Sequence, residues 1–564
     1  MKSTYIAVTR FSLMIFLLSS FSGKAGNDTI FLNSFEGAGV IVACSTPPMP
    51  AATGRCDVSA GTQFLLIKAD LATPHQLFQN GELLIGTNGE IQCAGCNCSQ
   101  VDGYAGATTL SCPEVVATPG LINSHDHLTF QSPAVDHGNE RFDHRHDWRT
   151  GERGHNNITL SPTDRGSDIN TLGEIRQLLG GVTSVVGSGS APGFVRNLDR
   201  SIDRDGLTGP DMELDTFPLG DSRGTLIESG CDYPEIPAPR SGQVYYPHVA
   251  LGIDQAARNE WLCLAQAVEN VDPTLPGPSL VNAISLTTQD IPALVETDAT
   301  VVWSPRSDLS LYGMTTPVSL LAGNGINITL GTNWAATGSN NMLREFSCAS
   351  QHNESALNGY FSDQEMLAMA TRSAAIAAGL GEQIGALQAG LTADVTLFDA
   401  SVNEGFSAPL KARPQDIVLV LKSGVPLFGD GPVVEGLGFG NDSCELMGSV
   451  IAGDCLSEHR LCVTREGSAN GFTYANLSPK TAGLAPLYSC DTAPALERSC
   501  VPSRNEGDGI VFTGLASAND NDGDGVEDTA DNCPQTFNPP RPVDGFVQSD
   551  SDNDGAGDFC DSTP

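Results

Sequence analysis

The chain has 564 residues, of which 40% are hydrophobic, and a formal net charge of −38 from 29 Lys and Arg against 67 Asp and Glu. This length and composition allow several domains with a large buried core and exclude a disordered chain. The excess of acidic residues argues against a nucleic-acid partner, because phosphate recognition depends on clustered Lys and Arg. It is compatible with divalent cations as ligands.

The N-terminus predicts export. Lys2 and Arg10 precede the apolar run Phe11–Phe21, and small residues follow. This order is typical of a secretory signal peptide, here residues 1–25, because a spanning helix needs roughly 20 apolar residues. An uncleaved anchor is the alternative. No later stretch is apolar enough to cross a bilayer, so we expect no membrane span after cleavage and a location in the periplasm, at the cell surface or in the medium.

Residues 27–118 contain short strand patterns such as Gln63–Ile67 and Gly81–Ile85, with a hairpin signal at Asn88-Gly89. Residues 119–380 then alternate buried strands with amphipathic helices, and residues 381–440 return to strands. The expected strands and helices of the middle segment are Val182–Val186, Leu280–Ile284, Thr300–Trp303, Ile326–Gly331, Leu172–Leu179, Asp254–Val268 and Gln364–Ala378. Such alternation predicts an α/β fold of the (β/α)8 TIM barrel type.

Two histidines end the first strand of this segment. The Pro119-Gly120 turn leads into a short apolar strand, which is followed by His125-Asp126-His127. On a strand, residues i and i+2 face the same side, so the two imidazoles point together while Asp126 points away. A strand end at a barrel mouth is where such a pair ligates a divalent ion.

The stretch Ala117–His127 resembles the first-strand metal motif of the amidohydrolase superfamily. Gly385–Val395 resembles that superfamily's return into a small β-sandwich, and Pro305–Asp308 and Gly331–Trp334 lie where its seventh and eighth barrel strands end. The resemblance covers roughly residues 60–435. It implies a TIM barrel at 119–380 and a small β-sandwich made of two segments, 27–118 and 381–440.

The resemblance also implies a site. Deaminase-like members hold one zinc or iron ion with two first-strand His, a later His and an eighth-strand Asp, and the ion activates water to hydrolyse a C–N bond. Position by position, this assigns metal ligation to His125, His127 and His248, with Asn333 in the place of the Asp. Zinc is the first expectation, iron the second, and the substrate is a small molecule that the sequence does not name.

Three positions depart from that pattern. Leu251 stands where the family has a proton-shuttling Glu, Asn282 where it has a substrate-polarising His, and Asn333 where it has the metal-binding Asp. Loss of one acid–base group costs about 10²–10⁴-fold in rate, whereas three His alone still hold zinc. Metal binding is therefore expected to survive better than catalysis, and Asn282 and Asn333 are only weak catalytic candidates.

A His- and Arg-rich insertion, Glu140–His155, follows the first strand, and residues 125–155 hold six of the ten His. It resembles insertions in exported bacterial members of the family. One interpretation folds it over the barrel mouth, where it supplies a base or a second metal ligand from Asp143, His144, His146, Asp147 or Glu152. The other is a solvated loop structured by its own ion pairs.

Sixteen cysteines in an exported chain favour disulfides over metal ligands. Residues 441–505 hold five of them and predict a loop-rich, disulfide-stapled extension. The cluster Cys93, Cys96 and Cys98 favours disulfides, with Cys112 as one partner, over a zinc knuckle, and Cys231 and Cys263 are expected to bridge.

The C-terminal segment 506–564 begins with a linker, 506–519, and continues with two calcium-loop patterns. Each has oxygen ligands at loop positions 1, 3, 5, 7, 9 and 12 and Gly at position 6. The residues are Asp520, Asp522, Asp524, Val526, Asp528 and Asp531 in the first loop and Asp550, Asp552, Asp554, Ala556, Asp558 and Asp561 in the second. The flanking cysteines resemble thrombospondin type 3 repeats, which implies Ca²⁺ in this tail; a disordered acidic linker is the alternative.

Two functional hypotheses follow. The first is an exported amidohydrolase-like enzyme that hydrolyses a non-peptide C–N bond with a metal-activated water. The second is a catalytically degenerate barrel that acts as a secreted binding or surface module, with the tail as a spacer or attachment element. A base near the metal water favours the first, and a pocket with only His, apolar and amide groups favours the second.

Overall fold

The structure is a computed structural model. It describes residues 39–45, 54–160, 166–187, 189, 191, 193–235, 242–268, 275–449, 454–462, 473–505 and 510–564. The expected signal peptide therefore lies outside the described residues. No helix in the described ranges is long and apolar enough to cross a membrane.

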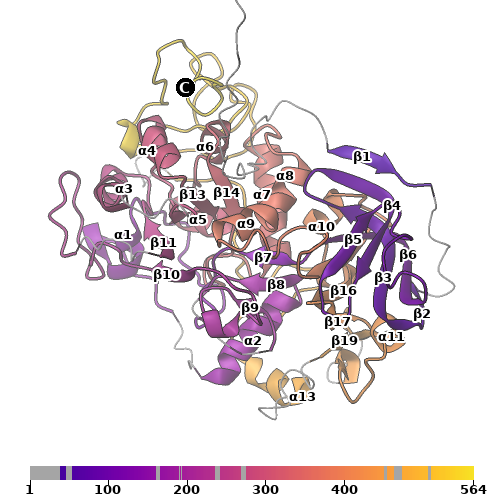
Figure 1. Cartoon of the computed structure of the whole chain (residues 1–564). Helices are drawn as coiled ribbons and strands as arrows, with labels where there is room; N and C mark the ends of the chain where they lie inside the picture. Colours follow the sequence, from indigo (N-terminus) through magenta and orange to yellow (C-terminus); the bar gives the residue numbers. More distant parts are fainter. Residues whose placement is uncertain are drawn as a thin grey trace, which may run out of the picture.

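Two chain segments build one large mixed sheet (Figure 1). Its strands are β1 (Val40–Ala43), β2 (Asp57–Ser59), β3 (Thr62–Ala72), β4 (Gln76–Ile85), β5 (Ile91–Gly95), β6 (Ala107–Pro119), β15 (Val395–Asp399), β16 (Ile417–Lys422), β17 (Val425–Asp430), β18 (Glu445–Leu446) and β19 (His459–Leu461). β6 pairs antiparallel with β15, with Val395 opposite Pro119. The expected return of 381–440 to the N-terminal strands is confirmed, and the two-layer sandwich stays a prediction.

Eight short parallel strands form the centre of the molecule, in two sheets ordered β7-β8-β9 and β10-β11-β12-β13-β14. They are β7 (Leu121–Asn123), β8 (Val182–Val185), β9 (Arg196–Asn197), β10 (Asp211–Asp215), β11 (Gln243–Val249), β12 (Ser279–Asn282), β13 (Thr300–Trp303) and β14 (Asn327–Leu330). β11, β13 and β14 have mostly buried residues, as expected of strands covered on both faces, whereas β10 carries Asp211, Glu213 and Asp215 and is mostly not buried.

Backbone contacts join the two sheets at one edge. The Ser124 N–H donates to the Leu330 carbonyl at 3.1 Å, and Asp126 forms a parallel bridge with Asn333, so the end of β14 lies beside the end of β7. A complete barrel also needs β9 beside β10, and the described residues record no pairing between them. The arrangement is a mixed α/β fold, and the closed (β/α)8 barrel stays a prediction.

Helices connect the parallel strands. They are α2 (Ser167–Leu178), α3 (Gln255–Val268), α4 (Ile291–Glu296), α5 (Pro305–Tyr312), α6 (Val318–Gly323), α7 (Met342–Ser355), α8 (Asp363–Met369) and α9 (Arg372–Ala377). The single helix expected over Gln364–Ala378 is wrong. Thr371 leaves the helical region, with φ −138° and ψ −94°, and divides the segment into α8 and α9. Shorter helices include α1 (Arg145–Thr150), α10 (Ser407–Lys411), α11 (Gly431–Gly436) and α13 (Tyr474–Leu477).

Asp394 fixes the large sheet to the start of β7. Its side chain forms a buried ion pair with Arg196 of β9 and accepts the Ser423 N–H at 2.9 Å. Its carbonyl accepts the Gly120 N–H at 2.8 Å. Gly120 itself is required by close approach, because a Cβ there would lie 2.4 Å from the Thr183 hydroxyl. These contacts fix the position at which β7 begins, and thereby the position of the two histidines that follow it.

All sixteen cysteines are paired. The bridges are Cys44–Cys96, Cys56–Cys112, Cys93–Cys98, Cys231–Cys263, Cys348–Cys500, Cys444–Cys462, Cys455–Cys490 and Cys533–Cys560. The expected disulfide chemistry and the Cys231–Cys263 bridge are confirmed. The expectation that Cys112 joins the 93–98 cluster is wrong. The register of β2 against β6 places Asp57 opposite Ser111, so Cys56 is the nearer partner.

The C-terminal tail packs against the body of the protein, near α4 and α6 (yellow in Figure 1). Ile510, Phe512 and Phe537 are buried in one apolar cluster with Leu311 and Tyr312 of α5. The expected linker 506–519 is thus corrected where it is described, because its apolar residues fill a gap beside α5. Residues 506–509 lie outside the described part.

Two arginines anchor this tail. Arg504 donates to the Phe142 and Tyr312 carbonyls at 3.2 and 2.9 Å. Arg541 donates to the Ile284 and Leu286 carbonyls at 3.1 and 3.2 Å. Buried carbonyl groups need donors, and these two arginines, one just before the tail and one within it, supply them.

Candidate metal centre and pocket

The three histidines expected as metal ligands lie together. His125 and His127 follow β7, and His248 is on β11. The Nε2 atoms of His125 and His127 are 3.3 Å apart, and the His248 ring centroid lies 4.6 Å from that of His125 and 5.3 Å from that of His127. One ligand nitrogen from each ring fits within a 4.8 Å group. Residues distant in sequence therefore form one three-nitrogen cluster.

The end of β14 supports this cluster through its backbone. The Asn333 N–H donates to the His125 carbonyl at 3.0 Å, and the His127 N–H donates to the Asn333 carbonyl at 2.8 Å. Gly331 allows the approach, because a Cβ there would lie 2.8 Å from the His125 nitrogen. Asn333 has a positive φ of 59°, which turns its backbone toward the histidines.

Burial keeps the three imidazoles neutral. Only 1% of His125 and 5% of His248 are exposed. Burial, and then the neighbouring His127, lower the pKa of His125 well below its ordinary value, and burial lowers the pKa of His127 to about 4. Burial is also the main cause of the lowered pKa of His248. Neutral imidazole is the form that ligates metals, so the set is ready to bind near neutral pH.

The three substituted positions all line the cavity at this cluster. Leu251 contributes an apolar side chain. The Asn333 amide donates to the Ser307 hydroxyl at 3.1 Å. The Asn282 amide donates to Asp308 at 2.5 Å, while its own side-chain oxygen is buried and has no hydrogen-bond partner. All three residues therefore line the cavity beside the histidines, where they offer amides and an alkyl group.

Two carboxylates lie close to the site without lining the cavity. Asp308 is fully buried behind Asn282 and accepts the Thr315 hydroxyl at 2.8 Å. Burial raises the pKa of Asp308 to about 7, although the hydrogen bonds from Thr315 and Asn282 oppose this. Asp126 faces away from the cluster, as expected, and accepts the Thr332 hydroxyl at 2.7 Å.

The histidines lie at a cavity of about 800 Å³, a size suited to a small organic molecule. Its described lining contains no Asp or Glu. The lining residues are His127, Thr129, Phe130, Arg145, Trp148, Arg149, Ile158, Leu160, Thr216, Phe217, His248, Leu251, Asn282, Ser307, Leu311, Tyr312, Asn333 and Trp334. Aromatic side chains and two arginines therefore share the cavity wall with the imidazoles.

The His- and Arg-rich insertion supplies part of this wall through α1. Arg145 donates to the His248 carbonyl at 3.1 Å and forms ion pairs with Asp221 at 2.5 Å and Glu260 at 3.1 Å. Burial opposes ionisation of Asp221, but the hydrogen bond from His146 and the charge of Arg145 lower its pKa to about 2. α1 is thus held over the strand ends by fully buried charges.

Both earlier interpretations of the insertion are partly right. It folds over the strand ends, and Asp147 pairs within the insertion with Arg153 at 2.5 Å. Its central part is buried, because His144, His146 and Asp147 have almost no exposed surface, whereas Thr150, Arg153 and Gly154 are exposed. The His144 Nε2 atom lies 3.2 Å from the Glu260 Oε1 atom, and Arg145 pairs with the same oxygen. We therefore interpret His144, His146 and Glu260 as a structural ion-pair cluster.

The first calcium loop brings Asp520, Asp522 and Asp524 within 4.8 Å of one another, and Asp550, Asp552 and Asp554 form a matching group. Gly525 and Gly555 have positive φ, 91° and 98°, at the predicted sharp turns. Asp528 and Asp558 accept backbone N–H groups of their own loops at 2.8 Å, and one oxygen each of Asp531 and Asp561 is buried without a partner. The loops are folded as the spacing predicts, with Val526 and Ala556 after the turns.

Burial and the neighbouring carboxylates raise the pKa of Asp522 to about 7 and that of Asp524 to about 6. One oxygen of Asp522, a residue only 4% exposed, has no hydrogen-bond partner. Buried carboxylates of this kind need a cation or a proton to offset their repulsion.

Sequence reasoning missed several residues of the pocket, among them Trp148, Phe217 and Trp334. It also missed Glu260, a charged residue on the buried face of α3 between Ala257 and Leu264. A carboxylate on an otherwise apolar helix face was the available signal. No comparable signal marks the aromatic residues, because aromatic side chains are more often part of a core.

Two segments of the chain match known protein families. Residues 275–428 match the family model described as the Amidohydrolase family, and residues 514–541 match the thrombospondin type 3 repeat. The chain is 31% identical over 153 residues to a 5-methylthioadenosine/S-adenosylhomocysteine deaminase of Caldicellulosiruptor saccharolyticus, which is 25% of this chain and 35% of that protein. It is 36% identical over 132 residues to the deaminase of the same name in Syntrophobacter fumaroxidans, 22% and 30% of the two chains.

The chain thus spans about a third of the length of the curated relatives it matches. Among solved structures, it is similar to an adenosine deaminase from Xanthomonas campestris with bound zinc, at a TM-score of 0.44 and 20% identity, over 64% of this chain and 92% of the other. Two segments of the chain are thus similar to known families, one to the amidohydrolase family and one to the thrombospondin type 3 repeat.

Proposed function

We propose that this chain binds one divalent transition metal at His125, His127 and His248 and hydrolyses a non-peptide C–N bond in a small substrate. The observation that carries the proposal is the convergence of three neutral histidines from β7 and β11 at a cavity of about 800 Å³. The deaminase relatives support the reaction class.

The donor set fits the metal. Three neutral imidazole nitrogens within 4.8 Å of one another suit zinc first and iron second. Asn333 is the weakest fourth ligand, because its amide is neutral and its nitrogen is engaged by Ser307. A divalent metal at such a site lowers the pKa of a bound water toward neutrality. The chain's own contribution is to hold the imidazoles through Gly331 and Asn333 and to enclose the substrate.

The wider organisation is part of the proposal. The β14–β7 contact supports a barrel at 119–380, and the β6–β15 pair supports a two-segment sandwich, 27–118 with 381–440. Eight disulfides support export with a signal peptide at 1–25. The repeat match and the paired acidic loops support Ca²⁺ binding by the tail, 506–564, which follows the Cys-rich extension 441–505.

One observation favours a second candidate function. The described lining of the cavity has no carboxylate, and Leu251, Asn282 and Asn333 leave no acid–base group beside the histidines. Among the described residues, Asp308 is the carboxylic acid that contacts an amide of the cavity lining, because it accepts a hydrogen bond from Asn282. If it takes no part, the chain is a catalytically degenerate barrel that binds a small molecule outside the cell, with the tail as a spacer or surface attachment.

Elemental analysis of the purified full chain tests the metal. About one equivalent of zinc or iron is expected, and the His125→Ala/His127→Ala variant is expected to lose it. Tail calcium is counted separately in the same sample and is the matched control, because it lies on another element and must not change. Equal transition-metal content in both proteins would contradict the proposal.

Turnover then separates the two candidates. The metal-loaded chain is assayed with neutral and anionic aromatic amines and amidines, and with the Asp308→Asn variant beside it. Hydrolysis that falls by about 10²-fold or more in Asp308→Asn supports the enzyme with Asp308 as its acid–base group. Stoichiometric metal without hydrolysis by either protein supports the binding module.

A further inference from the structure

Of the two arginines in the described cavity lining, Arg145 forms ion pairs and Arg149 has none recorded among the described residues. Arg145 pairs with Asp221 and Glu260. The Arg149 Nη2 donates to the Ser222 carbonyl at 2.5 Å, and its Nε is buried without a hydrogen-bond partner. A buried donor without a partner at a cavity wall is costly unless a ligand accepts from it.

Arg149 packs against an aromatic ring on one side, and its Nη2 also lies 3.3 Å from His146 Nδ1. Its guanidinium carbon lies 4.6 Å from the centroid of the Phe217 ring, which fixes the side chain against the wall. Trp148 and Trp334 have ring centroids 5.8 Å apart on the same cavity, and Phe130 lies 6.4 Å from Trp334. Burial, and then repulsion by Arg145, lower the pKa of Arg149, and the more distant carboxylates Asp221, Glu152 and Glu260 oppose this only in part.

We infer that the cavity takes a flat aromatic molecule that carries an anionic group, with the ring against the aromatic side chains and the anion on Arg149. The inference rests on the proposed function, since it names the substrate class of the same cavity. The aromatic side chains supply offset or edge-to-face contacts, and the guanidinium supplies a charge-assisted hydrogen bond in a site with little water. The imidazoles then meet the part of the molecule that lies away from the anion.

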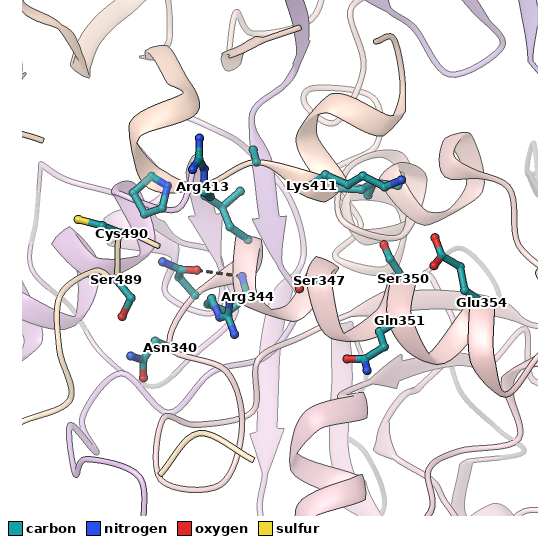
Figure 2. Close-up of a pocket in the computed structure, with 15 residues that line it drawn as sticks. Asn340, Arg344, Ser347, Ser350, Gln351, Glu354, Lys411, Arg413, Ser489 and Cys490 are labelled. Atoms are coloured by element: carbon teal, nitrogen blue, oxygen red, sulfur yellow. Dashed lines mark hydrogen bonds between the residues drawn. The ribbon is translucent and has the colours of Figure 1, made fainter. Parts of the chain in front are cut away.

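A second cavity, of about 330 Å³, provides the comparison (Figure 2). It lies between α7 and the segment 410–414 and also has cationic side chains, Arg344, Lys411 and Arg413. Arg344 pairs with Glu497, and Arg413 pairs with Asp416 and Asp491 at 3.0 and 2.7 Å. Its arginine charges are therefore satisfied, and its described lining has no aromatic residue.

The test is titration calorimetry of the full chain with 2-naphthoate and with 2-acetylnaphthalene, a neutral molecule of the same shape that has no C–N bond. We expect 2-naphthoate to bind about tenfold more tightly or better, as a charge-assisted hydrogen bond predicts. Arg149→Gln is expected to bring the two dissociation constants close together. Arg149→Lys, which keeps the charge, retains most of the preference, and Arg413→Gln leaves it unchanged.

Four results would overturn the inference: equal binding of both compounds, binding of neither at millimolar concentration, an unchanged preference in Arg149→Gln, or a loss of preference in Arg413→Gln alone. The metal analysis separates the two proposals. Bound metal without an anion preference removes this inference and leaves the proposed function. An anion preference dependent on Arg149 in a chain that binds no transition metal removes the hydrolase and leaves an aromatic-anion binding protein.

Discussion

At the scale of single residues, the close approach of two backbone segments decides the geometry of the candidate metal centre. His125, His127 and His248 carry the nitrogens, but Gly331 lets the end of β14 approach the backbone of His125. Asn333 then holds both first-strand histidines through backbone hydrogen bonds. The side chain at position 333 matters for chemistry, while its backbone matters for the position of the ligands.

Gly331→Ala tests this. A Cβ at 331 would lie 2.8 Å from the His125 nitrogen and 3.0 Å from Val302, so β14 must shift. We expect a loss of about 1–3 kcal/mol in stability and weaker metal binding than in the wild type. Gly440→Ala is the matched control, because a Cβ at 440 meets nothing within 4 Å. Thermal unfolding and metal titration are the measurements, and equal metal affinity in the two variants would refute the role given to Gly331.

At the scale of elements, buried charge fixes α1 over the strand ends. A six-residue helix has little stability of its own, so tertiary contacts must hold it. Arg145 provides them, since it joins α1 to Asp221, Glu260 and the His248 carbonyl. The pocket wall that carries Trp148 and Arg149 therefore depends on one guanidinium.

Arg145→Met is expected to loosen this wall. Two buried carboxylates then lose their cation, and breaking a buried pair in this way costs about 3–5 kcal/mol. Arg413→Met, in an exposed ion pair, is expected to cost about 1 kcal/mol or less. Amide hydrogen exchange over residues 143–150 is the measurement: faster exchange there in Arg145→Met, and not in Arg413→Met, is expected, and unchanged protection would contradict it.

At the scale of the whole molecule, the tail packs against residues that line the cavity. Phe512 and Phe537 pack with Leu311 and Tyr312, and both of these α5 residues also line the cavity. Arg504 further binds the Tyr312 carbonyl. Calcium in the tail is therefore expected to stabilise more than the tail itself.

Stability as a function of pH tests the calcium loops. Without calcium, the raised pKa values of Asp522 and Asp524, about 7 and about 6, lie above their value of 3.8 in an unfolded chain. The unfolded chain then binds fewer protons than the folded one between about pH 4 and 7, so stability falls as pH rises through this window. Calcium replaces the protons, so its stabilising effect grows with pH.

The expected result is a larger rise of the melting temperature on adding Ca²⁺ at pH 8 than at pH 5, measured on the full chain against a chelator blank. Asp522→Asn/Asp524→Asn is the control and is expected to remove most of the difference between the two pH values. An equal calcium effect at pH 5 and pH 8 in the wild type would count against calcium binding at this loop.

Most elements and the three histidines were predictable from the sequence, because they depend on local pattern. The i, i+2 spacing of His125 and His127, the alternation of strands and helices, and the Asp-x-Asp-x-Asp-Gly loops are each set within a dozen residues. The break at Thr371 and the partner of Cys112 were not, since each depends on packing against distant segments.

The sequence by itself determined the family resemblance, the ligand residues, the disulfide chemistry and the calcium-loop spacing. Only the tertiary structure decided that Arg145 forms buried ion pairs while Arg149 has none among the described residues, that Asp308 lies behind Asn282, and that the tail packs beside α5. The physical reason is that ligand type follows from side-chain chemistry, which each residue carries with it. Charge compensation, burial and the shape of a cavity arise only between residues that folding brings together.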